Sequence, residues 1–252
     1  MVDTNSHIGE TNMSNDGTEM KIIAYRKADD IDVEFLDKHH YIKQHTSYQL
    51  FKQGVIRNPY GKNNYGIGCT GDGKYLTAKD SEGKHPQAYT LWKGLLNRCY
   101  NEKEAENFPE YYGIATVCDE WLNYQNFAEW FYKNRYEIGD ERLHLDKDIK
   151  YYGNKIYSPY HCYLVPQSIN EQFRVDTRRK TKDIDLPYTV RRTKNGMYEA
   201  YHRGKSLGKF DTADECIKAY ITSKKNYIAK LVEKYKYMPE EIKQAILKAR
   251  LK

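Results

Sequence analysis

The apolar residues of this 252-residue chain occur in short runs whose period changes repeatedly along the sequence. Segments with the two-residue period of a strand alternate with segments at the 3.6-residue spacing of a helix, and Gly, Asn and Pro separate them. No apolar run approaches the roughly 18 residues that a membrane-spanning helix needs. We therefore expect an α+β protein built from several small modules, with no segment inside a membrane.

Composition favours folded modules over a disordered chain. Apolar residues make up 39% and aromatic residues 14% of the sequence, with 25 Tyr against 7 Phe. This is enough for small cores with amphipathic rims, because a tyrosine ring can be buried while its hydroxyl stays in water. We expect the tyrosines at such rims and do not interpret them as platforms for base stacking.

The five cysteines favour a reducing compartment. They are odd in number, widely spaced and form no CxxC pair, so we expect buried, reduced thiols. The N-terminus has neither the basic start nor the apolar stretch of a signal peptide, and we expect a cytoplasmic protein. A zinc site is an alternative, with candidate ligands Cys99, Cys118, His144 and Cys162.

Charge is distributed unevenly along the chain. Residues 1–20 carry four acidic and no basic residues, and residues 21–170 carry 20 of each sign. Residues 171–252 carry 21 basic against 11 acidic residues, so the net charge of +6 hides an excess of +10 in the last third. A basic segment beside a neutral body is typical of a protein that binds nucleic acid, and a merely solvated basic surface is the alternative.

The first half of the chain changes from a polar tail to strands and then to helices. The spacing of apolar residues and the Gly, Pro and Asn residues between elements define these segments. In chain order we predict a disordered tail over 1–20, a β-rich module over 21–75 with strands at 21–25 and 31–36, a linker over 76–87, and helices over 88–100 and 119–134 around a strand at 114–117.

The middle of the chain predicts a strand, a turn, a second strand and a helix. These lie at 143–149, 151–154, 163–165 and 167–174, and together they form a ββα unit. Strand alternation places His144, Asp146 and Asp148 on one face, with Lys147 between them. Carboxylates are hard ligands suited to Mg²⁺, and Asn170 near the start of the helix supplies a further oxygen. Turn formation or salt bridging is the alternative role for these acidic residues.

The last third predicts three short strands followed by helices. The strands lie at 188–192, 197–202 and 205–210, and the hairpin signals Asn195-Gly196 and Gly204 separate them. Thr212 and Glu215 form a capping box that opens a long helix, and Pro239 opens a final short one.

Two segments resemble known families. Residues 145–170, LDKDIKYYGNKIYSPYHCYLVPQSIN, resemble the degenerate HNH segment of bacteriophage homing-endonuclease-like proteins in their Leu-Asp, Gly-Asn, Tyr-Ser-Pro, Cys, Val-Pro and Asn landmarks. Residues 207–220, LGKFDTADECIKAY, are similar to the Apetala or ethylene-response-factor type of DNA-binding domain. The resemblance implies an HNH-like nuclease domain over 88–174 and a DNA-binding domain over 186–236. The C-terminal helix that Pro239 opens is expected over 238–252.

The HNH resemblance implies a metal site with an altered base. It makes Asp146 and Asn170 the ligands of Mg²⁺ or another divalent cation. The position of the general-base histidine holds Lys147, and the position of the loop-bracing asparagine holds His161. A lysine of ordinary pKa is protonated at pH 7 and accepts no proton from water, although burial beside a cation lowers that pKa. His144 is the substitute base.

The resemblance to the ethylene-response-factor family implies that the three-stranded sheet lies in the major groove of double-stranded DNA. Arginine can pair with guanine edges, while lysine mainly serves phosphates. The basic run 174–182 would follow the phosphate backbone between the two domains. The candidate DNA-binding residues are Arg191, Arg192, Lys194, Arg203 and Lys205 of the sheet, with Arg178 and Arg179 of this connector.

These observations predict a sequence-selective DNA endonuclease or nickase of the phage homing-endonuclease type, a metal-dependent hydrolase of phosphodiester bonds. The alternative is a catalytically inactive DNA-binding protein, such as a repressor or accessory factor, that keeps the HNH scaffold. Lys147 in the base position keeps this alternative open. A protein-binding inhibitor of a host enzyme is a third hypothesis.

Overall fold

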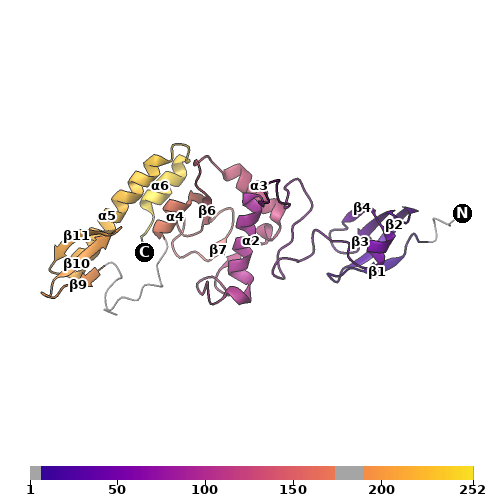
Figure 1. The fold of residues 1–252 in the computed structure, drawn as a ribbon, viewed down its shortest axis with the longest axis horizontal. Coiled ribbons are helices and arrows are strands. Elements are labelled where there is room, and N and C mark those ends of the chain that lie inside the picture. The colour runs from indigo at the N-terminus through magenta and orange to yellow at the C-terminus, as the bar shows by residue number, and fades with distance from the viewer. Residues whose placement is uncertain (1–6, 174–189, 252) are drawn as a thin grey trace. The chain divides into compact units, whose positions relative to one another are not determined.

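The computed structural model describes residues 7–173 and 190–251, and over this range the chain is a mixed helix and sheet protein (Figure 1). Two compact units divide it, Met1–Lys133 and Asn134–Lys252. The α+β class expected from the alternating periods is confirmed. Over the described residues, no helix combines the length and the apolar character that crossing a membrane requires.

The first unit begins with a four-stranded antiparallel sheet in which each strand pairs with the next one along the chain. Its elements are β1 (Thr11–Met13), β2 (Glu19–Lys27), β3 (Asp30–Phe35), β4 (Ile42–Thr46) and the short helix α1 (Tyr48–Lys52). Alternation along β3 sends Ile31, Val33 and Phe35 to one face, where they pack with Phe51 of α1. The strands predicted at 21–25 and 31–36 are confirmed.

The disordered tail predicted over residues 1–20 is wrong for residues 7–20. Residues 11–13 form an edge strand that pairs with the start of β2, and Met20 is fully buried. The Ser14 hydroxyl lies within hydrogen-bond distance of the Asp16 carboxylate and the Thr18 carbonyl, which holds the turn between the strands. Such a polar edge hairpin carries almost no apolar period, so a pattern of apolar residues does not reveal it.

The rest of the first unit is mainly helical and packs around aromatic side chains. Its elements are α2 (Gln87–Tyr100), the 3₁₀ turns η1 (Glu102–Glu104) and η2 (Asp119–Leu122), β5 (Thr116–Val117) and α3 (Tyr124–Asn134). Trp92, Phe127 and Phe131 are fully buried, and the indole of Trp92 donates to the carbonyl of Trp121 at 2.7 Å. The predicted helices are confirmed, except that residues 119–122 form a 3₁₀ turn.

The second unit contains a two-stranded and a three-stranded antiparallel sheet with helices packed on them. Its described elements are β6 (Leu143–Asp146), β7 (Ile156–Tyr157), β8 (Tyr163–Pro166), α4 (Gln167–Phe173), β9 (Val190–Arg192), β10 (Tyr198–His202), β11 (Lys205–Phe210), α5 (Ala213–Lys234) and α6 (Glu240–Lys248). Strand β6 pairs with β8 so that Asp146 lies opposite Tyr163, and α4 follows β8 without a loop.

The three strands β9, β10 and β11 form an antiparallel sheet in the order β11-β10-β9, and α5 packs on one face of it (Figure 1). Cys216 of α5 contacts Val190 and Ala200 in this small core. The predicted capping box is confirmed: the Thr212 hydroxyl accepts the N–H of Glu215, and the Glu215 carboxylate accepts the N–H of Thr212.

The C-terminal half of α5 enters a second core that it shares with α4 and α6. The residues of this core are Ile149, Val165, Ile169, Phe173, Ile228, Val232, Tyr235, Met238, Ile242 and Ile246. The reason is length: a 22-residue helix spans about 33 Å, whereas strands of three to six residues span about 10–20 Å. Helix α5 therefore extends well past the sheet.

The two compact units do not follow the predicted domain boundaries. Helices α2 and α3 lie in the first unit, whereas β6, β8 and α4 lie in the second. Residues 186–236 and 238–252 are not separate either, because α5 and α6 pack together with α4. Local patterns define each element but do not show which apolar stripes meet.

We expect Thr212→Ala to lower the free energy of unfolding by about 1 kcal/mol, because the first turn of α5 loses its side-chain cap. Urea unfolding followed by circular dichroism measures this change. Thr222 is exposed in the middle of α5, so Thr222→Ala is the matched control and should not destabilise the protein. An equal loss in both variants would contradict the capping role.

Candidate functional site

Two predicted site residues meet between β6 and α4. His144 lies in β6 and Asn170 in α4, and the His144 Nδ1 and Asn170 Nδ2 atoms are 3.4 Å apart. Both residues are half-buried. Asp146 shares a strand face with His144, because strand residues two apart point the same way. The fold therefore gathers a carboxylate, an imidazole and an amide in one small region of the second unit.

The carboxylate of Asp146 ends β6. Its Oδ1 accepts the backbone N–H of Asp148 at 2.8 Å and of Ile149 at 2.7 Å, so the chain turns directly after Asp146. Asp146 is only 9% exposed, and burial raises the pKa of its carboxyl group while the two N–H groups oppose that rise. The strand predicted over 143–149 is wrong beyond residue 146. Asp148 lies past that end and does not continue the strand face of His144 and Asp146.

Lys147 is held in an ion pair. Its Nζ lies 3.0 Å from Asp148 Oδ2, and the Lys147 side chain is 9% exposed. A protonated ammonium has three donors and no acceptor, so this pairing does not suit a general base. An imidazole can accept a proton near neutral pH, which makes His144 the better candidate for that role.

Asn154 braces the loop after β6. The HNH resemblance instead places the loop-bracing residue at His161. The Asn154 amide nitrogen donates to the carbonyls of Lys147 at 3.2 Å and Ile156 at 2.6 Å, and its oxygen accepts the Ile156 N–H at 3.1 Å. His161 instead lies 2.6 Å from the Ser158 hydroxyl. The Gly153-Asn154 dipeptide marks the turn predicted at 151–154, but it does not show which carbonyls the Asn154 side chain reaches.

The donors gathered here suit a weakly held divalent cation. Oδ2 of Asp146 takes no part in the two backbone hydrogen bonds, and the amide oxygen of Asn170 takes no part in the contact with His144. Magnesium in proteins often binds through one or two carboxylates and takes its other ligands from water and phosphate. Asp146 and Asn170 are thus chemically compatible with the cation that the HNH resemblance implies.

A second cluster of acidic and histidine side chains lies on the N-terminal sheet. Asp30, Asp32 and His45 bring ligand atoms within 4.8 Å of one another, the only such group of three His, Cys, Asp or Glu ligands among the described residues. The guanidinium of Arg26 already lies there, 2.7 Å from Asp30 Oδ1, and its hydrogen bonds to the two carboxylates lower the pKa of Asp30 and Asp32. A metal ion would have to displace Arg26. The cysteines considered for zinc are free thiols and form no comparable group in the described part of the chain.

The sheet face that points away from α5 carries mixed charge. Glu199 of β10 pairs in register with Arg191 of β9 on one side and Lys209 of β11 on the other. Arg191 lies over the ring of Tyr201, with its Cζ 4.7 Å from the ring centroid. Ser206 Oγ donates to Glu199 at 2.7 Å. Lys209 was missing from the predicted DNA-binding residues, although its strand alternation with Phe210 of the core could have identified it.

The other predicted cations do not share this outer face. Arg203 lies over Tyr227 of α5, 4.1 Å from its ring centroid, and Arg192 lies over Tyr198 at 5.5 Å. Lys205 pairs in register with His202, which contacts α5. Lys194 is exposed in the turn between β9 and β10. Arg178 and Arg179 lie outside the described residues.

His202, the last residue of β10, packs against α5. Its Nδ1 lies 2.9 Å from the Ser223 hydroxyl. Burial lowers the pKa of His202, and the nearby charges of Arg203 and Lys224 lower it further. The helix-facing side of the sheet therefore disfavours additional positive charge at this point.

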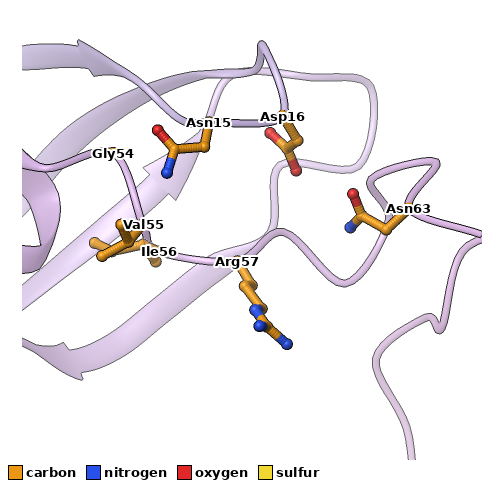
Figure 2. A pocket seen from close by; sticks show the side chains of 7 residues that line it. All are labelled: Asn15, Asp16, Gly54, Val55, Ile56, Arg57 and Asn63. Carbon is orange, nitrogen blue, oxygen red and sulfur yellow. The ribbon is translucent and has the colours of Figure 1, made fainter.

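The first unit also has a polar hollow of about 550 Å³, shown in Figure 2. Asn15, Asp16, Arg57 and Asn63 line it together with residues 54–56. All four polar side chains are exposed, and the one acid and one base among them leave the lining without a net charge. It does not contribute to the proposed chemistry.

Comparison with protein-family models, curated proteins and solved structures found no match to this chain.

We expect Asn154→Ala to destabilise the loop after β6, since three hydrogen bonds are lost around one side chain. Unfolding free energy should fall by about 2 kcal/mol, and the amide of Ile156 should exchange faster with deuterium. Asn226 is exposed on α5, and Asn226→Ala should change neither quantity. Unchanged exchange at Ile156 in Asn154→Ala would rule out the brace.

Proposed function

We propose that this protein is a metal-dependent DNA endonuclease or nickase of the phage homing-endonuclease type, acting on double-stranded DNA in the host cytoplasm. The observation that carries the proposal is the contact of His144 with Asn170 beside the buried Asp146. These three groups come from two elements that are distant in sequence, and their chemistry matches phosphodiester hydrolysis.

In this proposal each residue has a separate role. His144 takes a proton from water as the water oxygen bonds to phosphorus and a bridging P–O bond breaks; the leaving oxygen takes its proton from solvent. Asp146 and Asn170 hold the divalent cation, which supplies charge stabilisation at the phosphate when bound. Lys147 keeps its ion pair with Asp148 and acts on the site through position and charge alone.

DNA binding is assigned to the outer face of the three-stranded sheet. Arg191 can pair with a guanine edge, Glu199 can accept from the amino group of cytosine, and Lys209 suits a phosphate. Arg191 and Lys209 flank Glu199, and such a mixed set of charges favours recognition of particular bases over non-specific attraction to phosphates. The excess of +10 in residues 171–252 supplies the wider electrostatic attraction.

A second candidate function is DNA binding without cleavage. The specific observation in its favour is the Lys147–Asp148 pair, which places a paired cation where the HNH resemblance expects the base. In that case His144 and Asn170 would be structural partners, and the protein would act as a repressor or accessory factor.

We expect Asp146→Asn to abolish Mg²⁺-dependent nicking of supercoiled DNA while DNA affinity stays within about twofold. The asparagine oxygen can still accept the N–H groups of Asp148 and Ile149, so the turn should persist while the ligand charge is lost. Agarose-gel nicking assays and gel shifts measure the two effects.

Asp140 is exposed a few residues before β6, so Asp140→Asn is the matched control and should retain full nicking. Nicking by Asp146→Asn at the wild-type rate would show that the site is wrongly assigned. If the wild-type protein binds DNA but nicks none with any divalent cation, the non-catalytic function is correct.

We expect Lys209→Ala to weaken DNA binding and to reduce the slope of log affinity against log salt by about 0.9, the effect of one phosphate contact. Lys218 is exposed on α5, and Lys218→Ala removes the same charge away from the outer sheet face. Fluorescence anisotropy over a salt series separates the two. Equal slopes for both variants would place the DNA elsewhere.

A further inference from the structure

Three tyrosine rings are exposed on the loop that follows β6. Tyr151, Tyr152 and Tyr160 are 53%, 51% and 76% exposed. Tyr124 is fully buried, as expected for a tyrosine of a small core, but these three rings do not follow that expectation. Exposing large rings costs solvation free energy, and several in one short segment indicate a surface that is covered by a partner.

This tyrosine loop, residues 150–161, includes the short strand β7 and is ordered further by side-chain hydrogen bonds at its two ends. Asn154 joins it to the end of β6 at Lys147, and Ser158 holds His161 near the other end. The ring of Tyr151 packs edge-on against His161, with centroids 5.4 Å apart. Because the backbone is already ordered, binding a partner through these rings costs little additional entropy.

The charge around the rings selects the class of partner. Residues 149–162 contain Lys150 and Lys155 but no Asp or Glu. Arg250 adds a third cation, lying over the ring of Tyr152 at 4.7 Å from its centroid. An acid from outside the segment, Glu241, accepts the hydroxyl of Tyr163 beside Lys150. Exposed rings interleaved with cations, on a segment with no acid of its own, match a single-stranded nucleic acid, whose bases stack on aromatic rings while its phosphates pair with cations.

We propose that the tyrosine loop binds unpaired DNA bases next to the site at Asp146, with Tyr151 and Tyr160 as stacking rings. The proposal rests on the proposed function, since it assumes that DNA reaches this site. The loop begins four residues after Asp146 and is bonded to the turn that this carboxylate forms. A nucleotide stacked on the loop would therefore hold its neighbouring phosphate close to His144 and Asn170, which favours DNA with unpaired bases over intact duplex.

Two oligonucleotide duplexes of one sequence test this, one fully paired and one with a short unpaired bubble that contains 2-aminopurine. With the full chain and EDTA, we expect about tenfold tighter binding to the bubble and quenching of 2-aminopurine, the size of effect that stacking of one or two bases produces. Tyr160→Leu should reduce both the preference and the quenching, and Tyr160→Phe should keep them. Tyr237 is exposed at 62% outside the loop, and Tyr237→Leu is the matched control.

The outcomes separate this inference from the proposed function. Failure to bind either duplex overturns DNA binding altogether. Equal binding to both duplexes, with no change in Tyr160→Leu, overturns the stacking role and leaves the sheet as the DNA-binding surface. Self-association in sedimentation velocity that needs Tyr160 but no DNA would assign the rings to a contact between two copies of the chain and would also overturn the proposal.

Discussion

The second unit depends on the burial of one long apolar stripe on α5. Cys216 at one end of the stripe completes the core of the three-stranded sheet, while Ile228 and Val232 near the other end complete the core around α4 and α6. A 22-residue helix is too long for the sheet alone, so its second half leaves apolar surface that only other elements can cover. The candidate DNA-binding sheet and the candidate hydrolytic site are therefore both built on this helix.

Within that framework, Asp146 links local structure to chemistry. Its Oδ1 ends β6 by accepting two backbone N–H groups, and the loop that begins there is closed by Asn154. A buried carboxylate without such donors would tend to be protonated, whereas the N–H groups favour its charged form. The same side chain thus shapes the turn with Oδ1 and leaves Oδ2 outside those two hydrogen bonds, where a divalent cation could bind.

The sequence predicted much of the local structure and only part of the site. Thr212 and Glu215 identified the start of α5, and Asn195-Gly196 identified the hairpin turn, because capping and turn formation involve residues close in the chain. Residues 7–20 were predicted to be disordered because an exposed polar hairpin lacks an apolar period. The bracing role of Asn154 was also missed, because nothing in its local pattern shows which carbonyls it reaches.

The sequence by itself determined the class of the fold, the positions of most strands and helices, and the concentration of basic charge in the last third. These properties follow from composition and from neighbours within a few positions. The tertiary structure decided that His144 meets Asn170, that Arg191 and Lys209 flank Glu199 on one sheet face, and that the loop after β6 exposes its tyrosine rings. Such features depend on strand register and on which apolar surfaces pack together, and those follow from contacts between residues far apart in the chain.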